Sequence, residues 1–255
     1  MLLAVDIGNT NLTFGVFEGD KLRTTWRAAS GVHRMSDEYA SFLLSQLRVR
    51  GLEASDIRDG VFCSVVPPLV TTFVELYKNY FKVDPLVVEA GVKTGIKICM
   101  DNPREVGPDR VVNGVAAFKL YGGPCIVIDI GTAITFDVVA KNGDYIGGAI
   151  APGIAIATEA LFNRTAALPR VELEHPKKAI GTNTIAAMQS GIVYGYVGLI
   201  EGVVSRIQAE IRDHARVIAT GGYSNLLAEH SKIIDVVNPD LTLIGLKLIY
   251  NMNKS

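Results

Sequence analysis

The sequence contains little cysteine, no long block of one charge and no long apolar run. Its 255 residues include 3 cysteines, and 25 basic against 26 acidic side chains leave a net charge of -1. No lysine or arginine block exceeds two residues in a row, so the chain lacks the electrostatic footprint of a protein that binds nucleic acid or anionic membrane. No run of 18 apolar residues offers a transmembrane candidate. The expected partner is therefore a small molecule.

The cysteines and histidines show no spacing typical of metal or redox sites. Cys63, Cys99 and Cys125 stand far apart, each in an apolar context where burial is expected, which fits a reducing cytoplasm. The histidines are scattered and are expected on the surface: His33, His175, His214 and His230. Residues 1–5 are apolar, but Asp6 follows without a basic leader or cleavage site, which favours a first strand over a signal peptide. We expect a soluble, cytoplasmic protein.

Two common nucleotide-binding signatures are absent from the sequence. It contains no G-x-x-x-x-G-K-[ST] and no G-x-G-x-x-G after a strand, so the P-loop and Rossmann classes lose support.

The apolar pattern predicts an α/β protein with a large core, since 49% of the residues are hydrophobic. Strands are expected at 2–6, 12–18, 21–28, 60–66, 86–89, 126–129, 134–140, 145–149 and 216–219. Helices are expected at 36–50, 67–80, 105–121, 154–162, 184–211 and 223–229.

One pattern occurs twice. "DIGNTN" follows the first apolar strand, and "DIGTAITF" follows another that begins near Cys125. A repeat of about 120 residues is too long for a solenoid unit and indicates a duplicated domain. We predict halves at 1–121 and 122–255 that enclose a cleft.

The repeated motif carries the first functional hypothesis. Either copy alone is equally well explained as a hairpin turn, because Gly and Asn tolerate positive φ. A turn does not need the aspartate that ends the apolar strand, yet Asp6 and Asp129 both stand there, where burial is costly unless positive charge lies nearby. Such a motif would suit the phosphates of ATP. The backbone N–H groups at glycine and the hydroxyl groups would donate to phosphate oxygens, and the carboxylates would hold the cations that neutralise the charge.

Three other motifs leave alternatives open. "VIATGGYSNLL", residues 217–227, is either a simple strand-to-helix turn or a surface for a nucleoside. Pro108 predicts a helix start with Asp109 in the first turn, either as ordinary helix chemistry or as the group that orients a substrate hydroxyl and takes its proton. "GTNT" contains either a plain helix cap, Asn183 or Thr184, or a substrate contact.

A stripe of glycines lies on the helix expected at 184–211. Its members recur every three or four residues on one face: Gly191, Gly195, Gly198 and Gly202. Such a face allows close approach either by a strand of the same chain or by a second subunit.

In order along the chain, "DIGNTN", "DNPREVGPDR", "IDIGTAITFD", "GGAIAPGI" and "GTNT" resemble the type III pantothenate kinase family. The resemblance implies duplicated ribonuclease-H-like halves of the acetate-and-sugar-kinase/Hsp70/actin superfamily, with mixed sheets and flanking helices. It also implies transfer of the ATP γ-phosphate to pantothenate, the first step of coenzyme A synthesis. Mg²⁺, a monovalent cation (K⁺ or NH₄⁺) and a homodimer are implied with it.

The resemblance also assigns roles to residues. The ATP site would include the first turn and one threonine of the second: Asp6, Ile7, Gly8, Asn9, Thr10, Asn11, Leu12, Thr13 and Thr132. Pantothenate would contact Gly107, Pro108, Asp109, Arg110 and Thr184, with Asp109 as proton acceptor, and Asp129 would hold the monovalent cation. One position departs from the family pattern: a frequent tyrosine is here Met100, which offers apolar contact but no hydroxyl.

Two alternatives to this function remain on the sequence. A regulatory protein could keep the nucleotide fold without catalysis, although the presence of Asp6 and Asp109 disfavours that. A sugar or acetate kinase of the same superfamily is disfavoured by the small size and by "NPREVGPDR".

Overall fold

The computed structural model describes residues 1–254, which divide into two compact units. The first unit comprises Met1–Gly95, Asn102–Ala116 and Thr242–Ser255, of which the last residue lies outside the described part. The second comprises Ile96–Asp101 and Ala117–Leu241. Within residues 1–254, no helix is long and apolar enough to cross a membrane.

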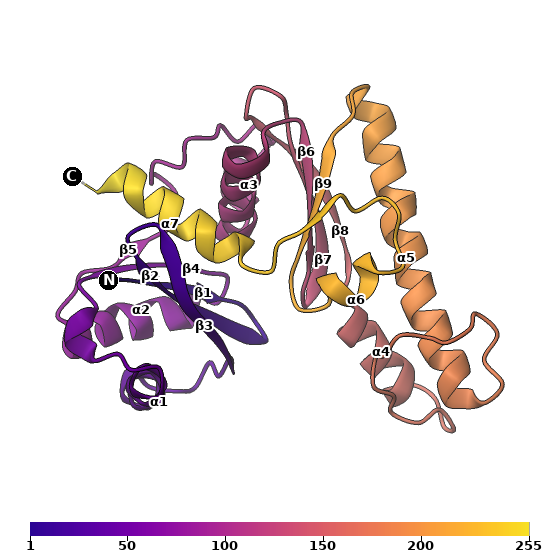
Figure 1. Cartoon of the computed structure of the whole chain (residues 1–255), viewed down its shortest axis with the longest axis horizontal. Coiled ribbons are helices and arrows are strands. Elements are labelled where there is room, and N and C mark those ends of the chain that lie inside the picture. The colour runs from indigo at the N-terminus through magenta and orange to yellow at the C-terminus, as the bar shows by residue number, and fades with distance from the viewer. Residues whose placement is uncertain (255) are drawn as a thin grey trace. The chain divides into compact units, whose positions relative to one another are not determined.

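The first unit is built on a five-stranded mixed sheet in the order β3-β2-β1-β4-β5 (Figure 1). Its strands are β1 (Leu2–Ile7), β2 (Asn11–Glu18), β3 (Lys21–Ala29), β4 (Asp59–Ser64) and β5 (Leu86–Val87). Strand β1 pairs antiparallel with β2 and parallel with β4, so β1 is the central strand. Its apolar sequence fits this place, because a central strand is buried on both faces.

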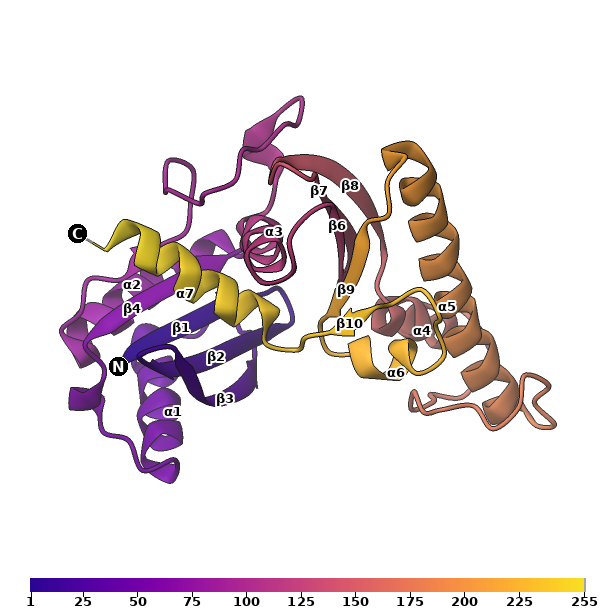
Figure 2. The ribbon, with the colours of Figure 1, turned by 45° about the horizontal axis from the view of Figure 1, so that its top comes forward.

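Helices cover the two faces of this sheet differently (Figure 2). Helices α1 (Ser36–Val49) and α2 (Pro67–Leu76), the latter continued by a π-helical turn at Tyr77–Phe81, share one hydrophobic core with Leu3, Val5 and Ile7 of β1. Because side chains alternate along a strand, Asp6 points to the opposite face. On that side lies α7 (Leu241–Asn253), whose Leu243 side chain contacts Gly15 of β2.

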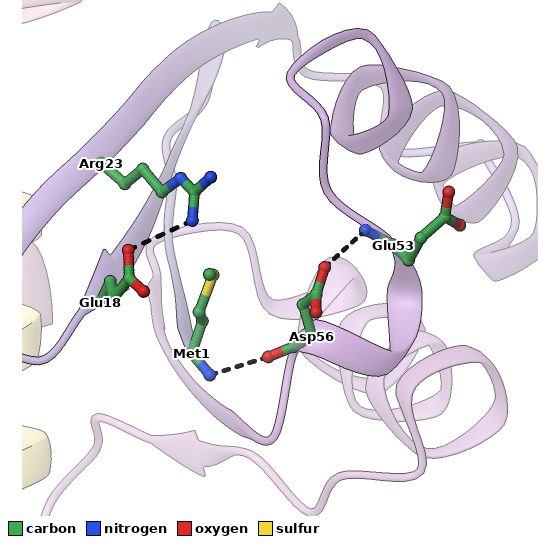
Figure 3. A network of polar contacts seen from close by, with 5 residues as sticks. All are labelled: Met1, Glu18, Arg23, Glu53 and Asp56. Carbon is green, nitrogen blue, oxygen red and sulfur yellow. Dashed lines mark hydrogen bonds and ion pairs between the residues drawn. The ribbon is translucent and has the colours of Figure 1, made fainter.

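Polar contacts anchor both chain ends within the first unit. The Met1 amino group donates to the Asp56 carbonyl oxygen at 2.7 Å, just before β4, as Figure 3 shows. Helix α7 is attached by a bond from Thr242 Oγ1 to Asn113 Oδ1 at 2.7 Å and by one from Tyr250 to Asp59. These contacts place the last helix on the unit that contains the first strand.

The second unit repeats the sheet order, β10-β9-β6-β7-β8. Its strands are β6 (Cys125–Ile130), β7 (Ala133–Val139), β8 (Tyr145–Pro152), β9 (Arg216–Thr220) and β10 (Val236–Val237). One face packs against α4 (Ile154–Asn163), α5 (Thr184–Ile211) and α6 (Ser224–Ala228) in a single core that includes Ile126, Ile128 and Ile130. Asp129 therefore also points away from the main helical core.

The two sheets confirm the predicted duplication and fold class. Counting outward from the central strand, β1 corresponds to β6, β2 to β7 and β4 to β9, with the same antiparallel and parallel pairings. Asp6 is the fifth residue of β1 and Asp129 the fifth of β6, and the burial pattern along the two strands is identical. Two mixed sheets with flanking helices are the expected architecture.

Several local expectations need correction. Cys99 is exposed rather than buried, while Cys63 and Cys125 are buried as predicted. The helix expected from residue 105 is α3 (Pro108–Tyr121), preceded by a short 3-10 turn at Pro103–Glu105. Strand β10 and helix α7 were not among the predicted elements. The compact units also divide α3 after Ala116 and assign α7 to the first unit, whereas the predicted halves meet after residue 121.

Candidate active site

The first predicted phosphate turn is a tight hairpin between β1 and β2. Asp6 pairs with Thr13 and Ile7 with Leu12, so residues 8–10 form the turn itself. The Gly8 amide donates to the Asn11 carbonyl oxygen at 3.0 Å, and a Cβ at Gly8 would lie 2.9 Å from that oxygen. The turn thus brings main chain close to main chain, and glycine leaves the room for it.

The turn residues differ in what they can present to a ligand. Asn9, Thr10 and Asn11 are exposed, whereas the side chains of Ile7 and Leu12 are fully buried in the core. Those two predicted ATP contacts can therefore act only through their backbone.

Ser30, at the end of β3, fixes the turn from outside. Its hydroxyl donates to the Gly8 carbonyl oxygen at 2.5 Å, and its amide donates to the Thr10 carbonyl oxygen at 2.9 Å. Sequence reasoning missed this residue because its two partners lie some twenty residues earlier, in the turn between β1 and β2.

The segment Gly107–Arg110 forms the start of α3, as predicted. One carboxylate oxygen of Asp109 accepts a bond from the Arg110 amide at 2.9 Å. A Cβ at Gly107 would lie only 2.5 Å from the same oxygen, so a larger residue there would move the carboxylate from this position. A carboxylate in the first turn is also stabilised by the helix dipole. Asp109 is thus held in a defined, half-buried orientation.

Cys63 of β4 lies beside the Asp6 carboxylate. Its thiol donates to Asp6 Oδ1 at 3.4 Å, since Cys63 is the register neighbour of Asp6 in the parallel β1–β4 pair. Burial, then the charges of Asp6 and Asp109, raise the pKa of the Cys63 thiol well above its usual value. The Asp6 carboxylate therefore contacts a thiol that stays protonated, and the charge of Asp109, in the same unit, also acts on that thiol.

The second unit holds its own carboxylate against a glycine loop. A Cβ at Gly221, where φ is +93°, would lie 2.6 Å from Asp129 Oδ1 and 2.6 Å from the Ile130 carbonyl oxygen. This loop belongs to the predicted "VIATGGYSNLL" element, and β9 brings it there because Thr220 pairs with Asp129. The expected third element thus meets the second repeated motif within one unit.

Thr132 sits in the turn after β6 and is held by its backbone. Its carbonyl oxygen accepts from the Gly153 amide at 3.1 Å, and a Cβ at Gly153 would lie 2.2 Å from that oxygen. Gly153, the last glycine of "GGAIAPGI", therefore allows close packing at this turn. In β8, Gly147 leaves room for Met100, whose sulfur lies 3.3 Å from the point a Cβ would take.

Thr184 lies in a pocket of its own. Asn183 caps α5 by accepting from the Ala186 amide at 2.9 Å, which identifies it as the cap between the two candidates. The 680 Å³ pocket around Thr184 is lined by "GTNT", the next turn of α5, Leu161 and Leu168. Asp129 and Thr132 are not among the residues that line this pocket, and in Figure 1 the start of α5 lies beyond α4 from the sheet.

The donor set suits phosphate and hard cations better than a transition metal. Among residues 1–254, no three histidine, cysteine, aspartate or glutamate side chains are placed to hold a metal ion. A cation at Asp129 would therefore complete its shell with backbone, ligand or water oxygens, as alkali and alkaline-earth cations commonly do. The Ile130 carbonyl oxygen beside Gly221 is one such group.

The glycine stripe of α5 faces away from the core. Gly191, Gly195 and Gly198 are exposed, and no atom of the described chain comes within 4 Å of where their Cβ atoms would stand, apart from their own helical neighbourhood. This excludes a strand of the described chain as the reason for the stripe.

The sequence was compared with families and proteins already known. A family model described as type III pantothenate kinase matches residues 2–206. A type III pantothenate kinase from Dehalococcoides mccartyi (strain CBDB1) is 57% identical over 253 residues, which cover 99% of this chain and 96% of that one.

Two solved structures share the fold at low sequence identity. A conserved putative Baf family transcriptional activator from Campylobacter jejuni matches with a TM-score of 0.63 at 21% identity, covering 98% of each chain. A putative 2-dehydro-3-deoxygalactonokinase from Sinorhizobium meliloti matches with a TM-score of 0.63 at 13% identity, covering 99% of this chain and 97% of that one. These likenesses support the sugar-kinase type of fold alone.

Proposed function

The chain belongs to the type III pantothenate kinase family, and from this we propose that it transfers the γ-phosphoryl group of ATP to the 4′-hydroxyl of pantothenate. It is a phosphotransferase with an alcohol group as acceptor, and the reaction opens coenzyme A biosynthesis. The observation that carries the proposal is that Asp6 and Asp109, from the two predicted motifs, lie in one unit, where Asp6 contacts the Cys63 thiol and the charge of Asp109 acts on the same thiol. A kinase of this kind uses ATP with a divalent cation.

The residues of the first unit suit two separate tasks. The hairpin at Gly8 offers backbone amides and exposed polar side chains to phosphate oxygens, and Asp6 would hold the cation that accompanies them. Bound Mg²⁺ would neutralise the charge of the phosphates. Asp109, fixed over Gly107, would orient the acceptor hydroxyl and take its proton late in the transfer, as the oxygen joins phosphorus and ADP leaves.

The test is an acceptor panel with the purified chain, ATP and Mg²⁺. Pantothenate, acetate and a hexose are supplied separately, and ADP and phosphorylated product are measured by mass spectrometry. We expect ADP and 4′-phosphopantothenate in equal amounts and no acceptor-dependent ADP with the other two. Product from acetate or the hexose would favour the other kinases, and no product at all would favour a regulatory protein.

Asp109→Asn should lower kcat by about 10²–10⁴, the usual contribution of a positioned proton acceptor, because the amide keeps the shape and loses the charge. The dissociation constant for ATP should change less than about twofold, since a group that acts on the acceptor adds little to nucleotide binding. Steady-state kinetics and calorimetric ATP titration measure the two effects. Asp101→Asn, an exposed aspartate just before the same segment, is the control. A near-normal kcat in Asp109→Asn would remove Asp109 from this role.

We further propose that a monovalent cation, K⁺ or NH₄⁺, binds beside Asp129. The support is that Asp129 Oδ1 and the Ile130 carbonyl oxygen both lie close to the point where a Cβ of Gly221 would stand. Oxygen atoms of this kind are the ligands that hard cations prefer.

Replacing KCl by NaCl at constant ionic strength should therefore slow the wild-type enzyme. Asp129→Ala should lose about tenfold or more in rate, the equivalent of an electrostatic contact of about 1.4 kcal/mol, and its rate should no longer depend on the salt. Asp144→Ala, a half-buried aspartate in the turn after β7, is the matched control. Equal wild-type rates in both salts would argue against a cation at this site.

We also propose a homodimer formed through the glycine stripe of α5. Each helical glycine costs about 1 kcal/mol relative to alanine, and no other part of the described chain packs there in return. A second copy of the helix would gain close backbone contact.

Gly195→Leu should weaken the dimer, because its side chain fills the space that the second helix would occupy. It should also raise the KM for pantothenate, because Thr184 begins the same helix. Sedimentation at micromolar concentration and steady-state kinetics measure the two effects, with Glu210→Leu at the exposed far end of α5 as control. An intact dimer with unchanged kinetics would separate the stripe from assembly.

A further inference from the structure

Cys63 holds a place that the reaction, as described so far, does not explain. Its side chain is 0% exposed, on β4 in the middle of the first unit. Its neighbour Phe62 points into the core shared with α1 and α2, so Cys63 points to the other face, which also carries Asp6. An apolar residue would satisfy burial equally well. A thiol differs from one in having a hydrogen-bond donor.

We infer that Cys63 is a positioning residue for the nucleotide site, whose thiol fixes the orientation of the Asp6 carboxylate. The hydrogen bond from Cys63 Sγ to Asp6 Oδ1, 3.4 Å long, is its geometric basis. The inference rests on the proposed use of Asp6 in binding ATP with its cation. It adds a residue that the motifs do not contain.

The chemistry of the thiol suits this task. The thiol donates its hydrogen to Asp6 Oδ1, so the contact is between a donor and a carboxylate oxygen. A thiol is also a weaker donor than a hydroxyl. It can therefore orient the carboxylate and still leave its charge available to a cation.

The alternative is that Cys63 only fills space. Cys125 provides the comparison within the same chain, because it is also 0% exposed, on β6, and burial raises its pKa to about 12. It begins its strand, four residues before Asp129, and its pKa shift has no carboxylate among its causes. Removal of either thiol leaves a cavity of similar size, but only removal of the Cys63 thiol takes a hydrogen-bond donor away from a carboxylate.

The experiment compares Cys63→Ala, Cys63→Val and Cys63→Ser with Cys125→Ala. Alanine is smaller than cysteine and valine is larger, and both lack the donor, whereas serine keeps it. Calorimetry with Mg²⁺ and a non-hydrolysable ATP analogue gives the dissociation constant without any acceptor. Steady-state kinetics with pantothenate give the KM for ATP, the KM for pantothenate and kcat.

We expect Cys63→Ala and Cys63→Val each to weaken binding of the Mg²⁺–analogue complex about three- to tenfold, the range for loss of one hydrogen bond. The KM for ATP should rise in parallel, with the KM for pantothenate unchanged. Cys63→Ser should stay within about twofold of wild type, and so should Cys125→Ala.

The inference would be overturned if nucleotide affinity followed side-chain volume instead of the presence of a donor. Cys63→Val would then bind the analogue as wild type does, or Cys63→Ser would bind it as weakly as Cys63→Ala. It would equally be overturned if Cys63→Ala and Cys125→Ala had the same effect. Should Cys63→Ala fail to fold, the comparison of valine with serine decides alone. A wild-type protein that binds the analogue but does not phosphorylate pantothenate would contradict the proposed acceptor and leave the binding comparison intact.

Discussion

The structure depends on one constraint: an aspartate stands near the end of each central strand, and the other residues of that strand are apolar. A carboxylate in such a place is costly unless its surroundings compensate the charge. The alternation of side chains sends Asp6 and Asp129 to the sheet face opposite the main helical core, so neither is forced into contact with the packed aliphatic side chains. The Cys63 thiol lies on the same face as Asp6, and the Gly221 loop lies against Asp129.

The two copies of the motif meet this constraint in different ways. Around Asp6 the unit supplies side-chain groups: the Cys63 thiol, with Asp109 on the first turn of α3 acting on the same sulfur. Around Asp129 it supplies backbone, because the Gly221 loop lies so close that no side chain fits. Duplication therefore produced equivalent positions with unequal chemistry. This is the arrangement expected if one half acts on the transferring phosphoryl group and the other binds a cation.

The sequence predicts those parts of the molecule that depend on local pattern. The strands beside Asp6 and Asp129, the Gly8 turn and the start of α3 at Pro108 follow from apolar alternation, glycine and proline, and the structure contains them. Contacts between distant residues were not predictable. Cys63 is 57 positions from Asp6, and nothing next to it marks a donor rather than an apolar residue. Alternation along β4, once its pairing with β1 is known, would have indicated it. Likewise, the place of α7 depends on Thr242 meeting Asn113 across 129 positions.

The central claim is that Asp6 and Asp109 act together in one phosphoryl transfer, and a double-mutant cycle tests it most directly. The kcat/KM for pantothenate would be measured at saturating ATP and Mg²⁺ for wild type, Asp6→Asn, Asp109→Asn and the double variant, with radiolabelled ATP to follow slow turnover. Groups that act as a unit give strongly non-additive losses. We predict that the double variant is within about threefold of the slower single variant. Losses that multiply, so that the double variant is slower by the product of the two single effects, would show that the carboxylates act independently and would contradict the account.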